Sequence, residues 1–476
     1  MAGEPRHIVM LPFMAQGHLI PFLSLARSLI FHHPSLTITL ATTPINARNL
    51  HSSLSDDHID SCIHIATLPY SSCDHSLPAG AENTDSVPKH DLVRFYHSGE
   101  SLRPHFAALL SDLETPPHCI IADAFVAWTV DLARSIGACH AVFTTCGAYG
   151  TAAYFSFWLH LPHTKTPSPE FHIPGFPDDF VIHRSQLSSY ARVADDRDPW
   201  TAFFRRQISF CLRSDVMLCN TAEEVETTGM DLLRKITGLP VHAIGPLLQL
   251  KEGRKIGKSA GRVVEWLAGK QAGSVVYVSF GTQNSISRTQ MIALARGLEE
   301  SGKPFVWVLR PPLGFDVNEE FRPEWLPVGF EERMRREGRG MLVMEMAPQL
   351  EILSHEATGA FVSHCGWNSV LESLNSGVPI IAWPLAAEQF YNAKMVVEEL
   401  KVGVEMVRGE EEVEGSEVAR VIGELVGGGE KRREMREKAG WCARKMKEAM
   451  EGNAVDEFWA VFERRDRASH EERVVL

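Results

Sequence analysis

Short apolar runs alternate with amphipathic stretches through the first half of the chain. The stretch at residues 19–30, which follows the first run, has helical spacing, with Pro21 tolerated in its first turn. The apolar runs lie at residues 7–11, 36–42, 119–122 and 141–145. Continuous apolar runs are typical of parallel strands that are buried on both faces. The pattern therefore predicts an α/β fold with a parallel sheet.

The same pattern restarts in the second half after a break. Residues 251–261 are rich in Lys and Gly, follow Gly245-Pro246 and are the best linker candidate. Further strand-like runs alternate with helical patterns beyond them, at residues 274–280, 305–309, 341–344, 359–362 and 378–382. The chain is therefore predicted to form two consecutive doubly wound halves, with ligands at the carboxyl ends of the strands.

Three other regions have a distinct composition. Residues 74–89 and 162–189 are rich in Pro, Ser, Asp or His, and we expect both to be surface loops. Residues 398–447 alternate acids and bases at helical spacing, which is typical of solvated helix faces.

Composition excludes several classes of function. Of 476 residues, 44% are hydrophobic and 22% charged, as in an ordinary globular protein. The net charge of −13 argues against nucleic acids and anionic membrane surfaces as partners. Nine dispersed cysteines without a CxxC pair are typical of reduced thiols, so we expect a cytoplasmic location. No apolar run reaches the length of a membrane span, so we expect no membrane insertion.

A polar turn directly precedes a short amphipathic helix in the second half. The helix is expected to end where Gly377 supplies a left-handed residue and Pro379 prevents continuation. Free N–H groups at a helix start bind anions, and Asn or Ser is the expected N-cap. The turn would surround a phosphate with imidazole, amide and hydroxyl groups from His364, Gly366, Trp367, Asn368 and Ser369.

Residues 346–389, a stretch of 44 residues, closely resemble the signature box of plant family 1 UDP-sugar-dependent glycosyltransferases of secondary metabolism. The matching motifs, in order, are APQ, ILSH, HCGWNSVLES, GVP, WP and EQ. The resemblance implies the GT-B fold, in which two Rossmann-like domains face each other across a cleft. It implies an acceptor domain at 1–248, a linker at 249–261, a UDP-sugar domain at 262–454, and, at 455–476, a terminal helix that packs back on the first domain and then a tail.

The same resemblance assigns the donor site residue by residue. Phosphate contacts fall on Thr282, His364, Asn368 and Ser369, and the ribose contact on Glu372. Main-chain contacts to uracil fall on Ala347 and Gln349, and Met346 stands where the family usually has a stacking Trp. The sugar would face Trp367, Glu388 and Gln389, although Trp367 could instead be packing and Glu372 a solvated helix face. Gln389 favours UDP-glucose, with pentose and glucuronate donors left open.

His18 and Asp123 each follow a predicted strand. Taken alone, His18 is more often a structural residue, and Asp123 is as often a helix N-cap. A helix start at His18 would favour the neutral imidazole that a general base needs. The segments PFMAQGH at 12–18 and ADAF at 122–125 resemble the catalytic His and Asp segments of the family, which implies base and orienting partner.

The acceptor is nearly invisible in the sequence. The resemblance implies a small lipophilic acceptor of the phenolic, flavonoid or terpenoid kind. Five aromatic residues after a predicted strand could line the acceptor pocket or could equally be core: Tyr149, Tyr154, Phe155, Phe157 and Trp158. We expect a monomer that needs no metal or cofactor. The DxD at 196–198 supplies too few ligands for a metal ion. The GRKIGKS at 253–259 has the wrong spacing for a phosphate-binding loop. A nucleotide-sugar-binding protein with weak turnover is the alternative. An oxidoreductase is disfavoured, because no GxGxxG follows the first strand.

Overall fold

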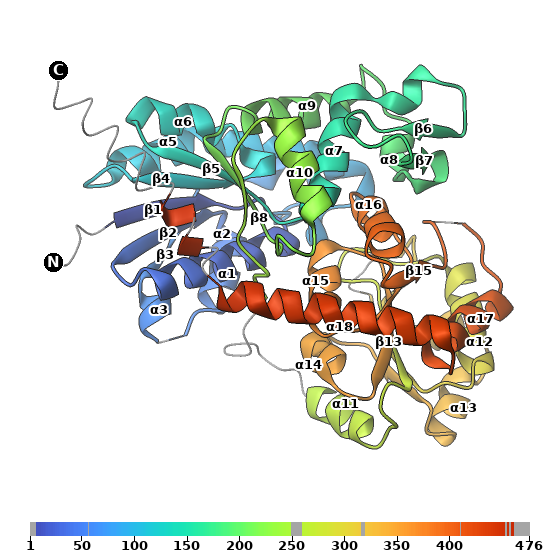
Figure 1. Cartoon of the computed structure of the whole chain (residues 1–476). Coiled ribbons are helices and arrows are strands. Elements are labelled where there is room, and N and C mark those ends of the chain that lie inside the picture. Colours follow the sequence, from blue (N-terminus) through green and yellow to red (C-terminus); the bar gives the residue numbers. More distant parts are fainter. Residues whose placement is uncertain are drawn as a thin grey trace.

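The computed structural model describes residues 6–55, 57–248, 259–315, 319–409, 411–452, 455–456 and 458–460. Within this part the chain forms a seven-stranded and a six-stranded parallel sheet, together with one two-stranded sheet. The two large sheets lie in two lobes, and the cartoon shows helices on both faces of each lobe (Figure 1). The prediction of two doubly wound α/β halves is confirmed.

The first sheet has the order β3-β2-β1-β4-β5-β8-β9. Its strands are β1 Arg6–Leu11, β2 Leu36–Thr42, β3 Ile63–Thr67, β4 Cys119–Asp123, β5 Cys139–Thr144, β8 Val216–Cys219 and β9 Val241–Ala243. The larger helices around it are α1 Gln16–His32, α2 Pro44–His51, α4 Leu92–Ser98, α5 Arg103–Asp112, α6 Thr129–Ile136, α7 Ala148–His160, α9 Pro199–Cys211 and α10 Thr227–Thr237. β4 and β8 are buried at every residue, as expected for strands covered by helices on both faces.

The second sheet has the order β12-β11-β10-β13-β14-β15. Its strands are β10 Val275–Ser279, β11 Phe305–Val308, β12 Gly340–Val343, β13 Thr358–Ser363, β14 Ile380–Ala382 and β15 Gly403–Glu405. Its helices are α11 Ser259–Ala268, α12 Arg288–Glu300, α13 Phe330–Arg336, α14 Gln349–Ser354, α15 Trp367–Asn375, α16 Gln389–Lys394, α17 Gly415–Val426 and α18 Glu430–Glu451. α11 covers the last three residues of the expected linker, and most of that linker and of the GRKIGKS stretch lies outside the described residues.

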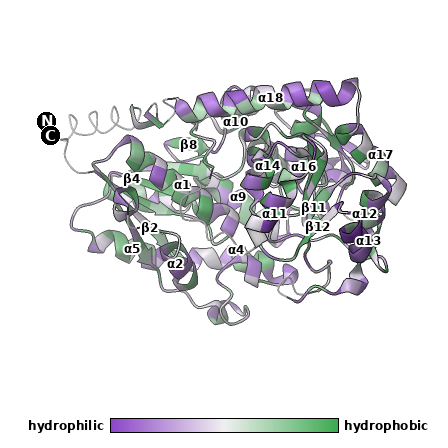
Figure 2. Cartoon of the chain, turned by 90° about the horizontal axis from the view of Figure 1, so that it is seen from below, coloured by the Kyte–Doolittle hydropathy of each residue, from purple (hydrophilic) through white to green (hydrophobic). Residues whose placement is uncertain are grey.

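The chain returns to the first lobe at its carboxyl end. α18 runs along one side of the second lobe toward the first (Figure 1) and is largely hydrophilic on its outer face (Figure 2). Its inner face buries Met435, Ala439, Cys442 and Met446. Beyond it, Phe458 and Trp459 pack into the core around α1, and the Trp459 ring stacks on His33 at 4.2 Å. Through these contacts the segment after α18 connects the second lobe to the core of the first lobe.

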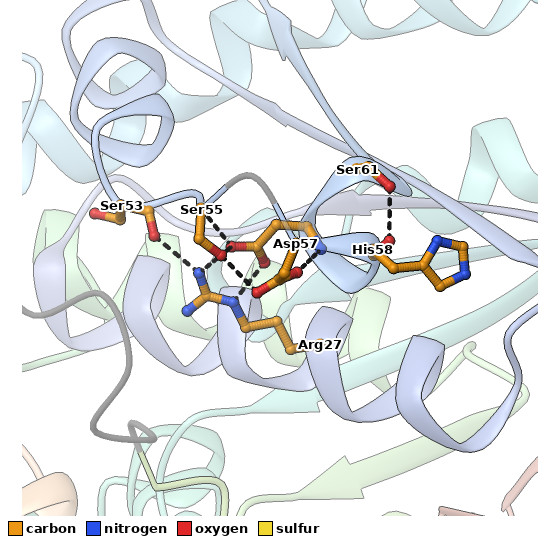
Figure 3. A network of polar contacts seen from close by, with 7 residues as sticks. Arg27, Ser53, Ser55, Asp57, His58 and Ser61 are labelled. Atoms are coloured by element: carbon orange, nitrogen blue, oxygen red, sulfur yellow. Dashed lines mark hydrogen bonds and ion pairs between the residues drawn. The ribbon is translucent and has the colours of Figure 1, made fainter.

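A polar network connects the carboxyl-terminal half of α1 to α3 (His58–Ser61). Arg27 donates from Nε and Nη2 to the two carboxylate oxygens of Asp60, each at 2.7 Å, and also to the carbonyl of Ser53 (Figure 3). Asp57 caps α3 through the N–H of Asp60. Charge-assisted pairs of this bidentate kind hold a helix in a fixed position.

Both expected surface loops contribute to the core, so that prediction is wrong in part. Residues 162–189 contain an antiparallel hairpin of β6 (Glu170–His172) and β7 (Val181–His183). The hairpin buries Phe171 and Ile182 against α7 and its neighbours. In the other region, Leu77, Ala81 and Val87 belong to a buried hydrophobic cluster. Isolated apolar residues among Pro and Asp are enough to pack a loop, and composition alone does not show them.

Among the described residues no helix is both long enough and apolar enough to cross a bilayer. The nine cysteines all fall in the described part, and each is a free thiol.

Candidate active site

His18 and Asp123 meet at the carboxyl edge of the first sheet. β1 and β4 are neighbours, with Leu11 paired to Ala122, so the loop after β1 and the end of β4 converge. His18 Nδ1 lies 2.6 Å from Asp123 Oδ2, and the Asp123 side chain is buried. A carboxylate in this position keeps the proton on Nδ1 and leaves Nε2 as the basic nitrogen.

Asp123 has two tasks. Its Oδ1 accepts the N–H of Phe125 at 2.9 Å and so caps the short 3₁₀ turn Ala124–Val126. Its other oxygen holds His18, so the N-cap interpretation and the orienting interpretation are both compatible with the geometry. Thr145, which sequence reasoning missed, places its Oγ1 3.3 Å from His18 Nδ1. Its position directly after β5, beside β4, was the available signal.

The charge environment favours protonated His18 more than the sequence indicated. Burial lowers the pKa of His18, but the charge and hydrogen bond of Asp123 outweigh burial, and Glu388 adds to them, so the pKa lies above its ordinary value. The expectation that the helix start keeps the ring neutral is therefore wrong in sign, because the adjacent carboxylate is the larger effect. The pair instead stabilises the imidazolium that forms once a proton has been abstracted.

Contacts between the lobes bring the second sheet to this pair. Asn368 Nδ2 donates to the carbonyl of Gly17 at 3.3 Å, directly beside His18. Gln283 Nε2 donates to Thr84 Oγ1 at 2.5 Å. The predicted catalytic and phosphate-binding segments therefore meet at the interface between the two lobes, which is called the seam below.

His364 occupies a slot that two glycines leave open. β10 and β13 are neighbours, with Ser279 paired to Ser363, so the loop after β10 meets the turn after β13. A β carbon on Gly281 would lie 2.9 Å from the imidazole, and one on Gly366 would lie 2.4 Å from Nε2. Burial lowers the pKa of His364 to about 4. A neutral ring offers an N–H dipole to a phosphate, not a full charge, which refines the expected role.

The helix after this turn starts two to three residues earlier than expected. Gly366, not Asn or Ser, is the N-cap of α15, because the extended backbone at Gly366 lets the helix begin at Trp367. Asn368 and Ser369 thus lie within the first turn, and Gly377 adopts the expected left-handed conformation after the end. Helix starts leave N–H groups without intrahelical partners, as an anion site requires.

The Gln349 side chain links the residues predicted to bind ribose and phosphate. Its Nε2 donates to Glu372 Oε2 at 2.6 Å and to Ser369 Oγ at 3.0 Å. Its Oε1 accepts the hydroxyl of Tyr277 at 3.0 Å. Sequence reasoning gave Gln349 only main-chain contacts, and here its side chain holds two predicted donor ligands in place.

The predicted sugar-facing pair lies on a tight turn before α16. Ala387 has a φ of +51°, which a non-glycine residue adopts only when its surroundings impose it. Gln389 Oε1 accepts the N–H groups of Leu385 and Ala386 at 3.0 and 2.9 Å, which closes the turn. Burial raises the pKa of the neighbouring Glu388, whereas the charge of His18 lowers it. The charges of His18 and Glu388 therefore influence each other between the lobes.

Trp367 lies in the interface between the lobes. It is buried, and its Nε1 donates to the carbonyl of Asn220 at 2.7 Å. A β carbon on Gly147 would lie 2.6 Å from the indole ring. The ring therefore has the packing role that the sequence analysis left open, and a sugar contact from this residue stays a prediction.

The remaining predicted donor residues differ in exposure. Met346 is 64% exposed, and Thr282 is exposed in the loop after β10, so neither is held in the core. Ala347 is buried and directly precedes Pro348 and Gln349, where α14 begins.

Known proteins show the same organisation. A family model described as UDP-glucoronosyl and UDP-glucosyl transferase matches residues 212–419. Crocetin glucosyltransferase 3 from Crocus sativus is 50% identical over 444 residues, which cover 89% of this chain and 90% of that protein. UDP-glycosyltransferase 92A1 from Arabidopsis thaliana is 39% identical over 471 residues, 95% of this chain and 96% of that protein. The chain belongs to the UDP-glycosyltransferase family.

A solved UDP-glycosyltransferase structure matches along the whole chain. Glycyrrhiza uralensis UGT73P12, complexed with glycyrrhetinic acid 3-O-monoglucuronide, superposes with a TM-score of 0.84 at 30% identity. The match covers 99% of this chain and 98% of that one. The GT-B fold that the signature box implied is therefore confirmed.

Aromatic side chains form the wall beside His18 in this UDP-glycosyltransferase. The rings of Phe13 and Phe125 lie 5.6 and 5.3 Å from the imidazole. Tyr96 packs on both, and the cluster continues outward through Trp200, Tyr190, Phe204, Tyr154 and Trp158. Of the five aromatic residues predicted as pocket or core, Tyr154 and Trp158 join this cluster, and Phe157 packs between Trp158 and His163. Tyr149 packs instead on Phe176 and Phe180, and Phe155 is buried.

The DxD motif is structural. Asp196 pairs with Arg205 at 2.7 Å, and Asp198 caps α9 through the N–H of Trp200 at 2.7 Å. In the part of the chain that the structure describes, no three His, Cys, Asp or Glu side chains are grouped so that they could hold a metal ion.

Proposed function

We propose that this enzyme transfers glucose from UDP-glucose, with inversion, to a hydroxyl of a small lipophilic acceptor of the phenolic, flavonoid or terpenoid kind. The observation that carries the proposal is the His18–Asp123 pair, at 2.6 Å, directly after Gly17, whose carbonyl accepts a hydrogen bond from Asn368 of the other lobe. A base on one lobe faces the predicted phosphate and sugar residues of the other. The activity named for the Crocus sativus relative supports glucose as the donor sugar.

In the proposed reaction the acceptor O–H donates to His18 Nε2. As Nε2 takes the proton, the acceptor oxygen bonds to the anomeric carbon, and the bond from that carbon to the phosphate oxygen breaks on the opposite face. UDP leaves with the electron pair. The neutral His364 N–H, Thr282, Asn368, Ser369 and the start of α15 stabilise its charge, and Asp123 stabilises the new imidazolium. General-base action of this kind supplies roughly 10²–10⁴-fold.

The acceptor class follows from the wall around the base. Planar or elongated apolar molecules match the partly exposed rings of Phe125, next to His18, and of Tyr96, which both pack on the buried Phe13. We further propose a monomeric, cytoplasmic enzyme that needs no metal, because fixed N–H dipoles and hydroxyls take the role of a cation.

The test is an incubation of the purified chain with UDP-glucose, a chelator and a panel of phenolic and terpenoid alcohols. The expected result is a product heavier by one hexose, with unchanged rate in the chelator, together with release of UDP. The same panel with UDP-glucuronate and UDP-pentoses decides the donor. Tight UDP binding without any product would instead favour the alternative, a nucleotide-sugar-binding protein with weak turnover.

A further inference from the structure

The turn that carries His364 has an unusual backbone. Cys365, directly after His364, is completely buried and has a φ of +61°. Residues with a β carbon rarely adopt this left-handed conformation, and they keep it only when the surroundings fix it. The conformation at Cys365 sets the direction of the His364 side chain and of Gly366, the N-cap of α15. Whatever fixes Cys365 therefore positions the predicted phosphate site.

The amide of Asn392 makes the contact that reaches this residue from outside the turn. Asn392 is 0% exposed, and its Nδ2 donates to the carbonyl of Cys365 at 3.0 Å. Within the turn itself, the N–H of Cys365 donates to Ser363 Oγ at 3.1 Å. Both main-chain polar groups of Cys365 are thus held, one locally and one by Asn392. A buried carbonyl that loses its donor is costly, so the turn depends on this amide.

The other end of the same amide touches the acceptor lobe. Asn392 Oδ1 accepts from Cys146 Sγ at 3.7 Å. A β carbon on Gly150, in the first turn of α7, would lie 2.3 Å from Oδ1. The glycine therefore leaves the space that the amide occupies. α7 also carries Tyr154 and Trp158 of the aromatic cluster, so the amide lies between the acceptor helix and the phosphate turn.

Asn392 also belongs to the helix that begins at Gln389. The two residues are three positions apart on α16, which places them on neighbouring turns of one helix face. Asn392 lies three residues beyond the signature box, so the box did not point to it.

We propose that Asn392 is a positioning residue that fixes the His364 turn and couples it to the position of α7. The proposal rests on the proposed function of that turn as the diphosphate site. The amide does not touch the reacting atoms, and it acts through the carbonyl of Cys365. Its loss is expected to weaken UDP binding more than acceptor binding, because the acceptor wall keeps its own aromatic contacts.

The first test compares Asn392→Ala with the unaltered chain by calorimetric titration with UDP and by steady-state kinetics. The expected result is a Kd for UDP and a KM for UDP-glucose raised about tenfold, with the acceptor KM changed less than twofold. Gln290→Ala is the matched control. Gln290 is also buried, and its Nε2 donates to the carbonyls of Gly409 and Glu411 at 2.9 Å, away from the seam. That variant should lose thermal stability and keep its UDP affinity.

Gly150→Ala tests the coupling from the acceptor side and leaves Asn392 in place. The added methyl group should displace the amide and raise the Kd for UDP in the same direction, although α7 belongs to the other lobe. In the Asn392→Ala background the clash with Oδ1 is gone and Cys146 Sγ, at 3.0 Å, is the nearest remaining atom. The second substitution should then change the Kd less than twofold. This variant also carries the test if Asn392→Ala does not fold.

The outcomes separate the two proposals. An unaltered chain that does not bind UDP overturns the proposed function. An unaltered chain that binds UDP, with Asn392→Ala or Gly150→Ala binding it within twofold as tightly, overturns the role of Asn392 and leaves the function standing. Additive effects in the double variant overturn the coupling to α7.

Discussion

The main-chain carbonyl of Gly17, one residue before His18, accepts a hydrogen bond from Asn368 Nδ2 at 3.3 Å. The two residues are 351 positions apart in the chain, and they join the loop of the candidate base to the first turn of the predicted phosphate helix. The separation of the candidate base and the predicted phosphate helix is therefore fixed by a direct contact and not only by the packing of two lobes.

Asn368→Ala is expected to lower kcat/KM for UDP-glucose by at least about tenfold, a loss of about 1.4 kcal/mol of transition-state stabilisation. The variant loses a predicted phosphate ligand and the contact to Gly17 together. Steady-state kinetics at varied UDP-glucose measure the effect. Asn375→Ala, at the carboxyl end of the same helix, is the control and should stay within twofold of the unaltered enzyme. Equal rates for all three proteins would contradict the predicted role.

The pH dependence of the reaction should report the His18–Asp123 pair. A general base must be unprotonated, and the pKa of His18 is raised above 6.5 because the charge and hydrogen bond of Asp123 outweigh burial. The acidic limb of kcat/KM should therefore lie above 6.5 in the unaltered enzyme. Asp123→Asn should move that limb to lower pH and reduce the rate through loss of the correct tautomer. An unmoved limb would exclude His18 as the titrating base.

The same shift predicts how the pair affects stability. A folded-state pKa above the unfolded value means that the native protein holds the proton more tightly. The pair therefore stabilises the fold fully below about pH 6.5, the unfolded value, and the contribution is lost as pH rises through the folded pKa. Denaturant unfolding of the unaltered protein and of His18→Ala at several pH values checks this, since the difference between the two should shrink on the alkaline side. His18→Ala should also lose roughly 10²–10⁴-fold of the transfer rate.

The sequence predicts the sheets well and the seam poorly. Strands of continuous apolar residues, such as β4 and β13, are visible because helices cover both their faces. The signature box predicts His364, Glu372 and Gln389 as donor-site residues because their spacing along one segment is fixed. Contacts between segments far apart, such as Gln283 to Thr84, carry no local pattern. Their existence depends on how two separately folded lobes dock.

The errors have local physical causes. The N-cap of α15 was expected at Asn or Ser, but Gly366 adopts the extended conformation there, and Asn368 instead donates to Gly17 in the other lobe. The pKa of His18 was judged from the helix start, and the nearby carboxylate of Asp123 reverses the direction. Asn392 was missed because an asparagine in a helix next to the box gives no sign that its amide supports a left-handed residue elsewhere.

Met346→Trp is expected to retain turnover and to bind UDP more tightly. Contacts of a thioether with an aromatic ring contribute about 0.3–1.5 kcal/mol, whereas base stacking on an aromatic side chain contributes about 1–3 kcal/mol. The Kd for UDP should fall by up to about tenfold. Met344→Trp, at a site that is 51% exposed two residues earlier, is the control and should not change the affinity. An inactive Met346→Trp enzyme would mean that the uracil-binding pocket has a different shape from the one predicted.

Gln349→Ala should raise the KM for UDP-glucose about tenfold with little change in kcat. Its amide holds Glu372 at 2.6 Å and Ser369 at 3.0 Å, so its loss frees the predicted ribose and phosphate ligands together, while His18 and Asp123 on the other lobe stay paired. Such a change removes binding that ground state and transition state share. Tyr277→Phe, which removes only the hydroxyl bonded to Gln349 Oε1, should raise the KM by a smaller factor in the same direction. A fall in kcat with an unchanged KM would instead place Gln349 in the chemical step and contradict its assignment as a support of the donor site.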